Sequence, residues 1–137
     1  MRAAWDSVKQ RLLMFGGQTT DTPFLGDLWA LDADGWTEIT AETKPSPRTF
    51  YAMIFDDEGG RLILFGGNTQ DGAVNDLWFF DSASDTWSQA SPEGDAPSAR
   101  AGHDAVWLPE RRSVIVFGGN DGDADLNDLW ELSVGTG

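Results

Sequence analysis

The stretch Leu62-Ile63-Leu64-Phe65-Gly66-Gly67, followed by Asp76-Leu77-Trp78, decides how this chain folds. An apolar run, a double glycine and an Asp-Leu-Trp occur in the same order in two further copies, Leu12–Gly17 with Asp27–Trp29 and Val114–Gly119 with Asp128–Trp130. Gly16 and Gly66 lie 50 residues apart, and Gly66 and Gly118 lie 52 apart. A period near fifty residues indicates a tandem array of similar structural units.

The second copy predicts four short strands, at Arg48–Phe55, Arg61–Phe65, Asp76–Phe80 and Thr86–Ala90, with a polar loop over Asn68–Asn75. After its arginine, the second strand is apolar at every position, and a strand of this kind is buried on both faces. Such burial is expected where each sheet lies between two neighbouring sheets, as the blades of a β-propeller do. We expect each Asp-Leu-Trp tryptophan to pack between blades and its aspartate to accept backbone N–H bonds.

These motifs resemble the kelch repeat family, which is also seen in galactose-oxidase-type propellers. The resemblance implies an all-β, kelch-like propeller segment of about three four-stranded antiparallel blades. It covers residues 1–137 as a single partial propeller, with blade 1 at about 1–41, blade 2 at about 48–91 and blade 3 at about 100–134. The last blade lacks its outer strand, because no tryptophan strand follows Leu132.

The composition excludes several classes of function. Nine basic and 23 acidic residues give a formal net charge of −14, which repels nucleic acid and anionic membrane surfaces. No apolar run is long enough to cross a membrane as a helix. The chain has no cysteine, which excludes disulfides and thiolate chemistry but leaves the compartment undecided.

No catalytic residue or cofactor is predicted. His103 is the only histidine, and its neighbour Asp104 points to the opposite face of the strand, so a Ser-His-Asp arrangement is not favoured. One histidine cannot build a typical transition-metal site. Asp121, Asp123 and Asp125 alternate as calcium ligands do, but the glycine and glutamate of an EF-type loop are missing, which favours an acidic solvated loop.

Binding residues are expected at one rim of the central channel. Arg48 and Arg100 lie 52 residues apart, so they hold the same place in successive blades. The resemblance implies that strand starts and the loops after Gly-Gly meet at this rim, where Arg48, Arg100, Gln18, Asn68, Asn120, Tyr51 and His103 could surround a ligand. Arginine grips a carboxylate with two hydrogen bonds. The alternative is that each arginine pairs with a neighbouring aspartate of its own chain.

We therefore expect a non-enzymatic binding module whose partner is a protein segment or a carbohydrate. A structural part of a larger propeller enzyme is the alternative, since three blades leave two apolar end faces uncovered. Those faces would be covered by further blades or by a second copy. A pair of chains would give six blades and 29.8 kDa, twice 14.9 kDa. The loops Gln18–Gly26, Asn68–Asn75 and Asn120–Asn127 differ most between copies, and Gln18–Gly26 contains Pro23, Phe24 and Leu25.

Overall fold

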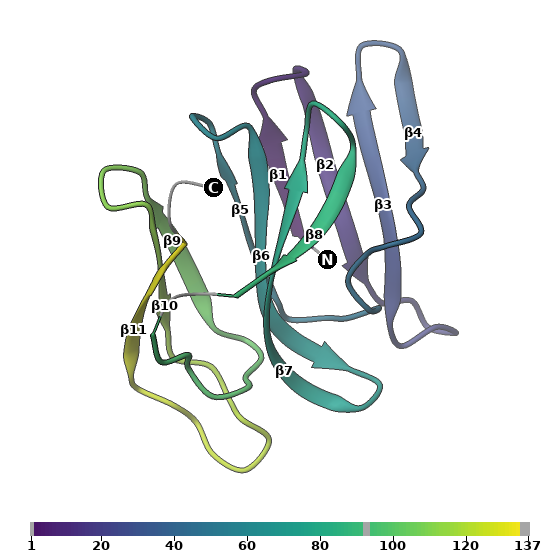
Figure 1. Ribbon diagram of the computed structural model, residues 1–137. Helices are drawn as coiled ribbons and strands as arrows, with labels where there is room; N and C mark the ends of the chain where they lie inside the picture. The colour runs from purple at the N-terminus through teal and green to yellow at the C-terminus, as the bar shows by residue number, and fades with distance from the viewer. Residues whose placement is uncertain (1, 92–93, 135–137) are drawn as a thin grey trace.

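The computed structural model describes residues 2–91 and 94–134, and within these it contains eleven strands and no helix. They form three separate antiparallel sheets, which we call blades 1, 2 and 3 (Figure 1). Blade 1 comprises β1 (Arg2–Asp6), β2 (Arg11–Gly17), β3 (Leu25–Asp32) and β4 (Gly35–Ile39). Blade 2 comprises β5 (Ala52–Asp56), β6 (Arg61–Thr69), β7 (Gly72–Asp81) and β8 (Thr86–Ala90). Blade 3 comprises β9 (Asp104–Leu108), β10 (Ser113–Phe117) and β11 (Leu129–Ser133).

Each blade is a simple meander in which strands that follow one another in sequence are paired. The turn between the first two strands is built alike in every blade, since Gln10, Gly60 and Arg112 occupy the same place and all have positive φ. These turns lie at one end of the molecule, which we call the turn end. The β2–β3, β6–β7 and β10–β11 connections lie at the opposite end, which we call the loop end (Figure 1).

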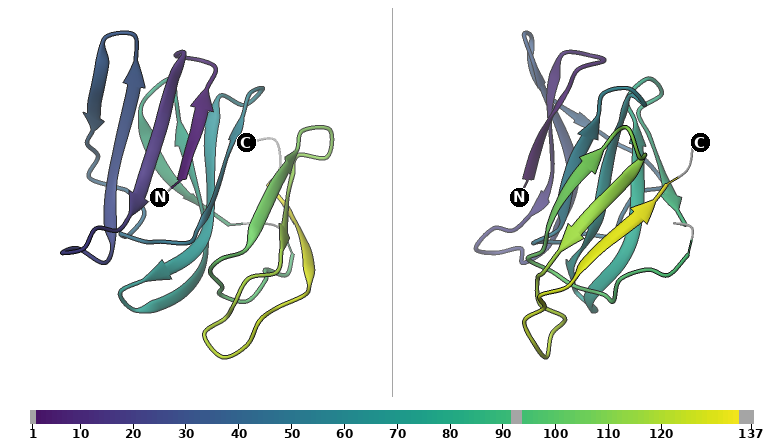
Figure 2. Two further views of the ribbon diagram at one scale, coloured as in Figure 1. Left: turned by 180° about the vertical axis from the view of Figure 1, so that it is seen from behind. Right: turned by 90° about the vertical axis from the view of Figure 1, so that its left-hand side faces the viewer.

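The blades stand side by side, as the two further views show (Figure 2). Their first strands form the contacts that run from blade to blade, because β1 lies next to β5 and β5 lies next to β9. One apolar core fills the space between blades 1 and 2, and a second fills the space between blades 2 and 3. This arrangement confirms the predicted partial propeller and its three-stranded last sheet.

Strand β6 shows why the apolar run decides the fold. Leu62 and Leu64 belong to the core shared with blade 1, whereas Ile63 and Phe65 belong to the core shared with blade 3. All four side chains are at most 1% exposed. Because successive side chains of a strand point to opposite faces, a strand between two neighbours needs an apolar residue at every position.

One local expectation is wrong. The region Asn68–Asn75 is not a polar loop, because β6 continues to Thr69 and pairs with Gly72 at the start of β7 in a tight hairpin. Gly72 has a φ of 111°, which suits glycine at this bend. The aspartate of the Asp-Leu-Trp motif also accepts side-chain donors, which the sequence did not predict. Asp76 accepts the indole N–H of Trp78 at 2.8 Å and a guanidinium group.

The outer faces of blades 1 and 3 carry exposed apolar side chains. On blade 1, Trp5 and Trp36 are 52% and 51% exposed. On blade 3, Val106, Phe117 and Leu129 are 54%, 53% and 65% exposed. These positions correspond to residues of blade 2 that are packed against a neighbouring blade, so we call the two surfaces the end faces.

Candidate interaction site at the loop end

Arg48 and Arg100 each hold an aspartate of their own blade. Nη1 and Nη2 of Arg48 donate to the two carboxylate oxygens of Asp76 at 2.6 and 2.9 Å, and Arg100 binds Asp128 at the same two distances. Nη1 also donates to the carbonyl of the first glycine of the pair, Gly66 at 3.1 Å and Gly118 at 3.0 Å. Both arginines are fully buried. We call this arrangement the arginine joint.

The backbone of the same arginine binds the preceding blade. The N–H of Arg48 donates to the Leu25 carbonyl at 3.0 Å, and its carbonyl accepts from Gly17 at 3.1 Å. Arg100 repeats both bonds, to the Val74 carbonyl and from the Gly67 N–H, at 3.1 and 2.9 Å. Each arginine therefore ties two blades together, with its backbone on one and its side chain in the next.

The electrostatics of the joint follow from this geometry. Burial alone would raise the pKa of the Asp76 carboxyl, but the hydrogen bonds and the charge of Arg48 outweigh burial and lower the pKa below its ordinary value. Hydrogen bonds from Arg100 and Trp130 likewise lower the pKa of Asp128. Both carboxylates thus stay ionised opposite a permanently charged guanidinium group.

Tyr51 and His103 are buried and act between blades. The Tyr51 hydroxyl donates to the Phe15 carbonyl, and Nε2 of His103 lies 2.9 Å from the Phe65 carbonyl. Burial raises the pKa of Tyr51 to about 12. Burial, opposed by the bond to Phe65, lowers the pKa of His103. A neutral histidine that donates from Nε2 fits this position.

The rim candidates therefore separate into two sets. Arg48, Arg100, Tyr51 and His103 hold the blades together, and the bonds that a ligand was expected to make to the arginines are made by Asp76 and Asp128. Gln18, Asn68 and Asn120 lie at the loop end with accessible surface, and their role in binding stays a prediction. Asn120 already donates to Asp125 at 2.9 Å and accepts from the Gly122 N–H at 2.7 Å.

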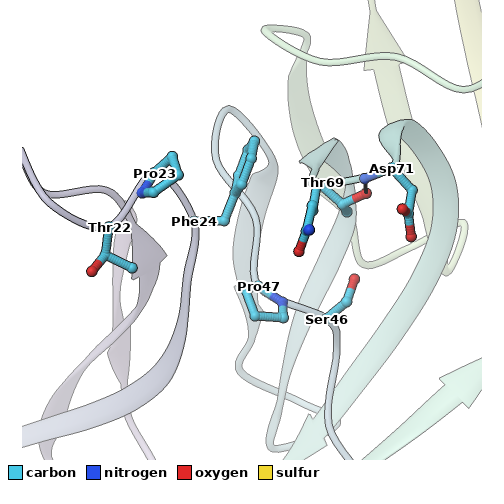
Figure 3. A pocket seen from close by; sticks show the side chains of 8 residues that line it. Thr22, Pro23, Phe24, Ser46, Pro47, Thr69 and Asp71 are labelled. Carbon is cyan, nitrogen blue, oxygen red and sulfur yellow. Dashed lines mark hydrogen bonds between the residues drawn. The ribbon is translucent and has the colours of Figure 1, made fainter.

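A groove at the loop end was not predicted as a site. It has a volume of about 470 Å³ and lies between the β2–β3 loop and the β6–β7 hairpin, with its floor at the segment that leads into blade 2. Figure 3 shows the Phe24 ring standing between these segments, with Pro47 below and Thr69 and Asp71 opposite. Its lining consists of Thr22, Pro23, Phe24, Ser46, Pro47, Thr69, Gln70 and Asp71. The unusual Pro23-Phe24-Leu25 in the first variable loop was the sequence signal for it.

Acidic side chains predominate on the connections at the loop end, where this groove lies. The accessible acidic side chains on the connections at the loop end are Asp21, Asp71, Asp95, Asp121, Asp123 and Asp125. Lys44 is the exposed cation among the described residues of these connections, because Arg48 and Arg100 are buried and paired. The loop end therefore offers an apolar groove in an acidic surface.

Other chemistries find little support in the described residues. Residues 2–91 and 94–134 contain no group of three or more histidine, cysteine, aspartate or glutamate side chains placed to hold a metal ion. Asp121 instead accepts the N–H groups of Asp123 and Ala124, both at 2.9 Å. No membrane-spanning helix occurs in these ranges.

Comparison with known proteins agrees with this geometry. The KLHDC2/KLHL20/DRC7 Kelch-repeats domain model matches residues 1–137. The chain belongs to the kelch-repeat family, which confirms the resemblance that its double glycines and tryptophans suggest. Kelch repeats commonly serve as protein-interaction modules.

Relatives place these repeats in varied larger proteins. The chain is 35% identical over 132 residues to Acyl-CoA-binding domain-containing protein 4 of Arabidopsis thaliana, covering 94% of the chain and 19% of that protein. It is 39% identical over 118 residues to Dynein regulatory complex subunit 7 of Chlamydomonas reinhardtii, covering 82% of the chain and 10% of that protein. It is 35% identical over 91 residues to Rab9 effector protein with kelch motifs of Xenopus laevis, covering 64% of the chain and 24% of that protein. The chain thus spans less than a quarter of each of these three relatives.

Proposed function

We propose that this chain is a protein-interaction module that binds a basic peptide segment in the groove at the loop end. The observation that carries the proposal is the groove itself, where Phe24 and Pro47 offer apolar contact beside the carboxylate of Asp71. Binding sites typically combine apolar walls with a few polar groups that set the orientation of the ligand.

The proposed partner segment carries lysine or arginine next to an apolar or proline residue. Its apolar side chain would lie against Phe24, and its positive charge would face Asp71 and the acidic loops around it. Opposite charge speeds association and selects partners, and its effect weakens as salt rises. The names of two relatives, a Rab9 effector and a dynein regulatory complex subunit, support a protein partner over a carbohydrate.

The test is a peptide and glycan array probed with the chain, followed by titration of the selected peptide at 50 and 300 mM salt. We expect basic peptides to be selected and Phe24→Ala to weaken their binding at least fivefold. Asp71→Asn should lower affinity and reduce its dependence on salt. Glu58→Gln, an equal charge change at the turn end, serves as the matched control and should leave affinity unchanged. Selection of neutral glycans, or equal loss with Glu58→Gln, would overturn the proposal.

A further inference from the structure

Blade 1 contains one half of an arginine joint. In blades 2 and 3 the guanidinium group is received by the two oxygens of an aspartate and by the carbonyl of the first glycine of a pair. The equivalent groups in blade 1 are the Asp27 carboxylate and the Gly16 carbonyl. In the described ranges 2–91 and 94–134, no ion pair joins Asp27 to a cation.

The groups of blade 1 are already arranged as in the two complete joints. Trp29 Nε1 donates to Oδ2 of Asp27 at 2.6 Å, as Trp78 and Trp130 do to their aspartates at 2.8 and 2.7 Å. This bond orients the Asp27 carboxylate through Oδ2. In the two complete joints, the other carboxylate oxygen, Oδ1, accepts a hydrogen bond from Nη1 of the arginine. The backbone matches too, because φ is 63° at Gly16, 67° at Gly66 and 68° at Gly118.

The nearby cation Arg2 is engaged elsewhere. Its Nε donates to the Tyr51 carbonyl at 3.1 Å, and its backbone N–H donates to the Tyr51 hydroxyl at 2.9 Å. Asp27 is half-buried, so its unmatched oxygen lies in a partly dehydrated position where an opposite charge is worth more than on the open surface.

We propose that Asp27 and Gly16 form a binding site for the guanidinium group of an arginine in a Ser-x-Arg segment. The two complete joints define the ligand, because Ser46-Pro47-Arg48 and Ser98-Ala99-Arg100 share this pattern. Their serines take part, since Arg48 and Arg100 donate Nε to the carbonyls of Ser46 and Ser98, both at 3.1 Å. The site is separate from the proposed peptide groove and does not depend on it.

The probe is a synthetic peptide with the sequence of residues 46–50, titrated into the 15N-labelled chain. Because Trp29 Nε1–H bonds to Asp27, its indole resonance should shift and saturate, whereas those of Trp78 and Trp130 should stay in place. A peptide with citrulline in place of arginine keeps the shape but loses the charge, and we expect it to bind at least tenfold more weakly. An equal response to citrulline would overturn the proposal.

Asp27→Asn should weaken binding of the arginine peptide, as followed by the Trp29 indole resonance, at least tenfold. Asp34→Asn is the matched control, because it removes one exposed carboxylate from the β3–β4 turn of the same blade, away from the groove. Unchanged resonances of Trp78 and Trp130 show that the Asp27→Asn chain remains folded. Equal binding by the Asp27→Asn chain and the unaltered chain would also overturn the proposal.

A second arm separates the sources of the arginine. In this arm, a copy of residues 46–50 is fused to the N-terminus of the chain. Its arginine then lies three residues before residue 1, just as Arg48 lies three residues before Tyr51, the equivalent of residue 1 in blade 2. If the tethered arginine fills the site, the Trp29 resonance should start at its shifted position and added peptide should not move it. If only a separate segment reaches the site, the resonance should move on peptide addition alone. Absence of both responses would contradict the assignment.

Discussion

Tyr51 in blade 2 and His103 in blade 3 make the same contact with different chemistry. Each binds the carbonyl oxygen of the phenylalanine that precedes a double glycine in the blade before, Phe15 for the tyrosine and Phe65 for the histidine. Each also packs edge-on against that phenylalanine ring, with centroids 5.6 and 5.3 Å apart. Each contact between blades thus has one side-chain hydrogen bond, but only the histidine changes its charge near neutral pH.

This difference predicts a pH dependence of stability. Burial keeps the pKa of His103 below its ordinary value of 6.5, so the unfolded chain binds a proton more readily than the folded chain. The contribution of neutral His103 is therefore complete above about pH 6.5 and is lost as the pH falls through the folded pKa. Urea unfolding between pH 5 and 8 should show stability falling on the acid side. His103→Gln should flatten that slope, and an unchanged slope would contradict the role of His103.

The arginine joint should dominate the response to single substitutions at charged sites. Arg48→Met leaves the Asp76 carboxylate, whose side chain is 21% exposed, without its partner. Removing one member of a buried pair costs about 3–5 kcal/mol, and we expect a loss in the lower part of this range. Lys44→Met, at an exposed cation on the same connection, should change the free energy of unfolding by less than about 0.5 kcal/mol. Similar losses of unfolding free energy for the two variants would show that the arginine joint does not cause the destabilisation.

Trp78 and Trp29 offer a comparison of one motif position in two settings. Trp78 is 9% exposed in the core between blades 1 and 2, where its ring lies 6.5 Å from that of Trp87. Trp78→Ala should destabilise the chain by about 3–5 kcal/mol, as truncation of a buried aromatic side chain does. Trp29 faces the open side of blade 1, so Trp29→Ala should cost clearly less in denaturant unfolding. A loss under about 1 kcal/mol for Trp78→Ala would exclude tight packing between blades.

The end faces should make the isolated chain associate. Exposed apolar patches favour association, and both end faces carry apolar side chains that are more than half exposed. Light scattering should give a mass above 14.9 kDa that rises with concentration. Leu129→Glu should reduce association, whereas Phe50→Glu, at an exposed residue on neither end face, should not. A clean single-chain mass at high concentration would argue against this prediction.

Phe50 carries backbone strain that the repeat itself reveals. Its φ is 56°, a value that bulky residues rarely adopt, and the equivalent residue of blade 3 is Gly102 with a φ of 71°. The Phe50 side chain is 59% exposed, so it gains little from packing. Phe50→Gly should therefore stabilise the chain by about 0.5–1 kcal/mol, the relief of strain exceeding the extra entropy lost by glycine. Thermal unfolding measures the change, and a lower midpoint would show that the ring contributes packing.

Much of the fold can be predicted from the sequence, because the apolar pattern of a strand depends on whether neighbouring blades cover one of its faces or both. The uninterrupted apolar run Leu62–Phe65 is typical of a strand whose two faces are both buried. In the structure, blade 1 covers one face of this strand and blade 3 covers the other. The extended β6–β7 hairpin was missed because polar residues pair there through their backbones, which leaves no mark on the apolar pattern.

The candidate site was less accessible to sequence reasoning. The place of the arginines was recognised from their spacing, but their partners, Asp76 and Asp128, lie 28 residues further along the chain. Pairing over that separation depends on how strands return within the blade. The groove likewise joins three connections from two blades, and no single stretch of sequence contains its shape.

The arginine joint has a consequence for how such chains grow. The backbone of Arg48 binds blade 1 and its side chain binds blade 2. The segment Ser46–Arg48, which precedes the first strand of blade 2, therefore stabilises both blades. A gene duplication whose boundary fell between this segment and the following sheet would separate the segment from one of the two blades that it binds. Duplications that preserve folding should therefore copy the serine-to-arginine linker together with the sheet that follows it.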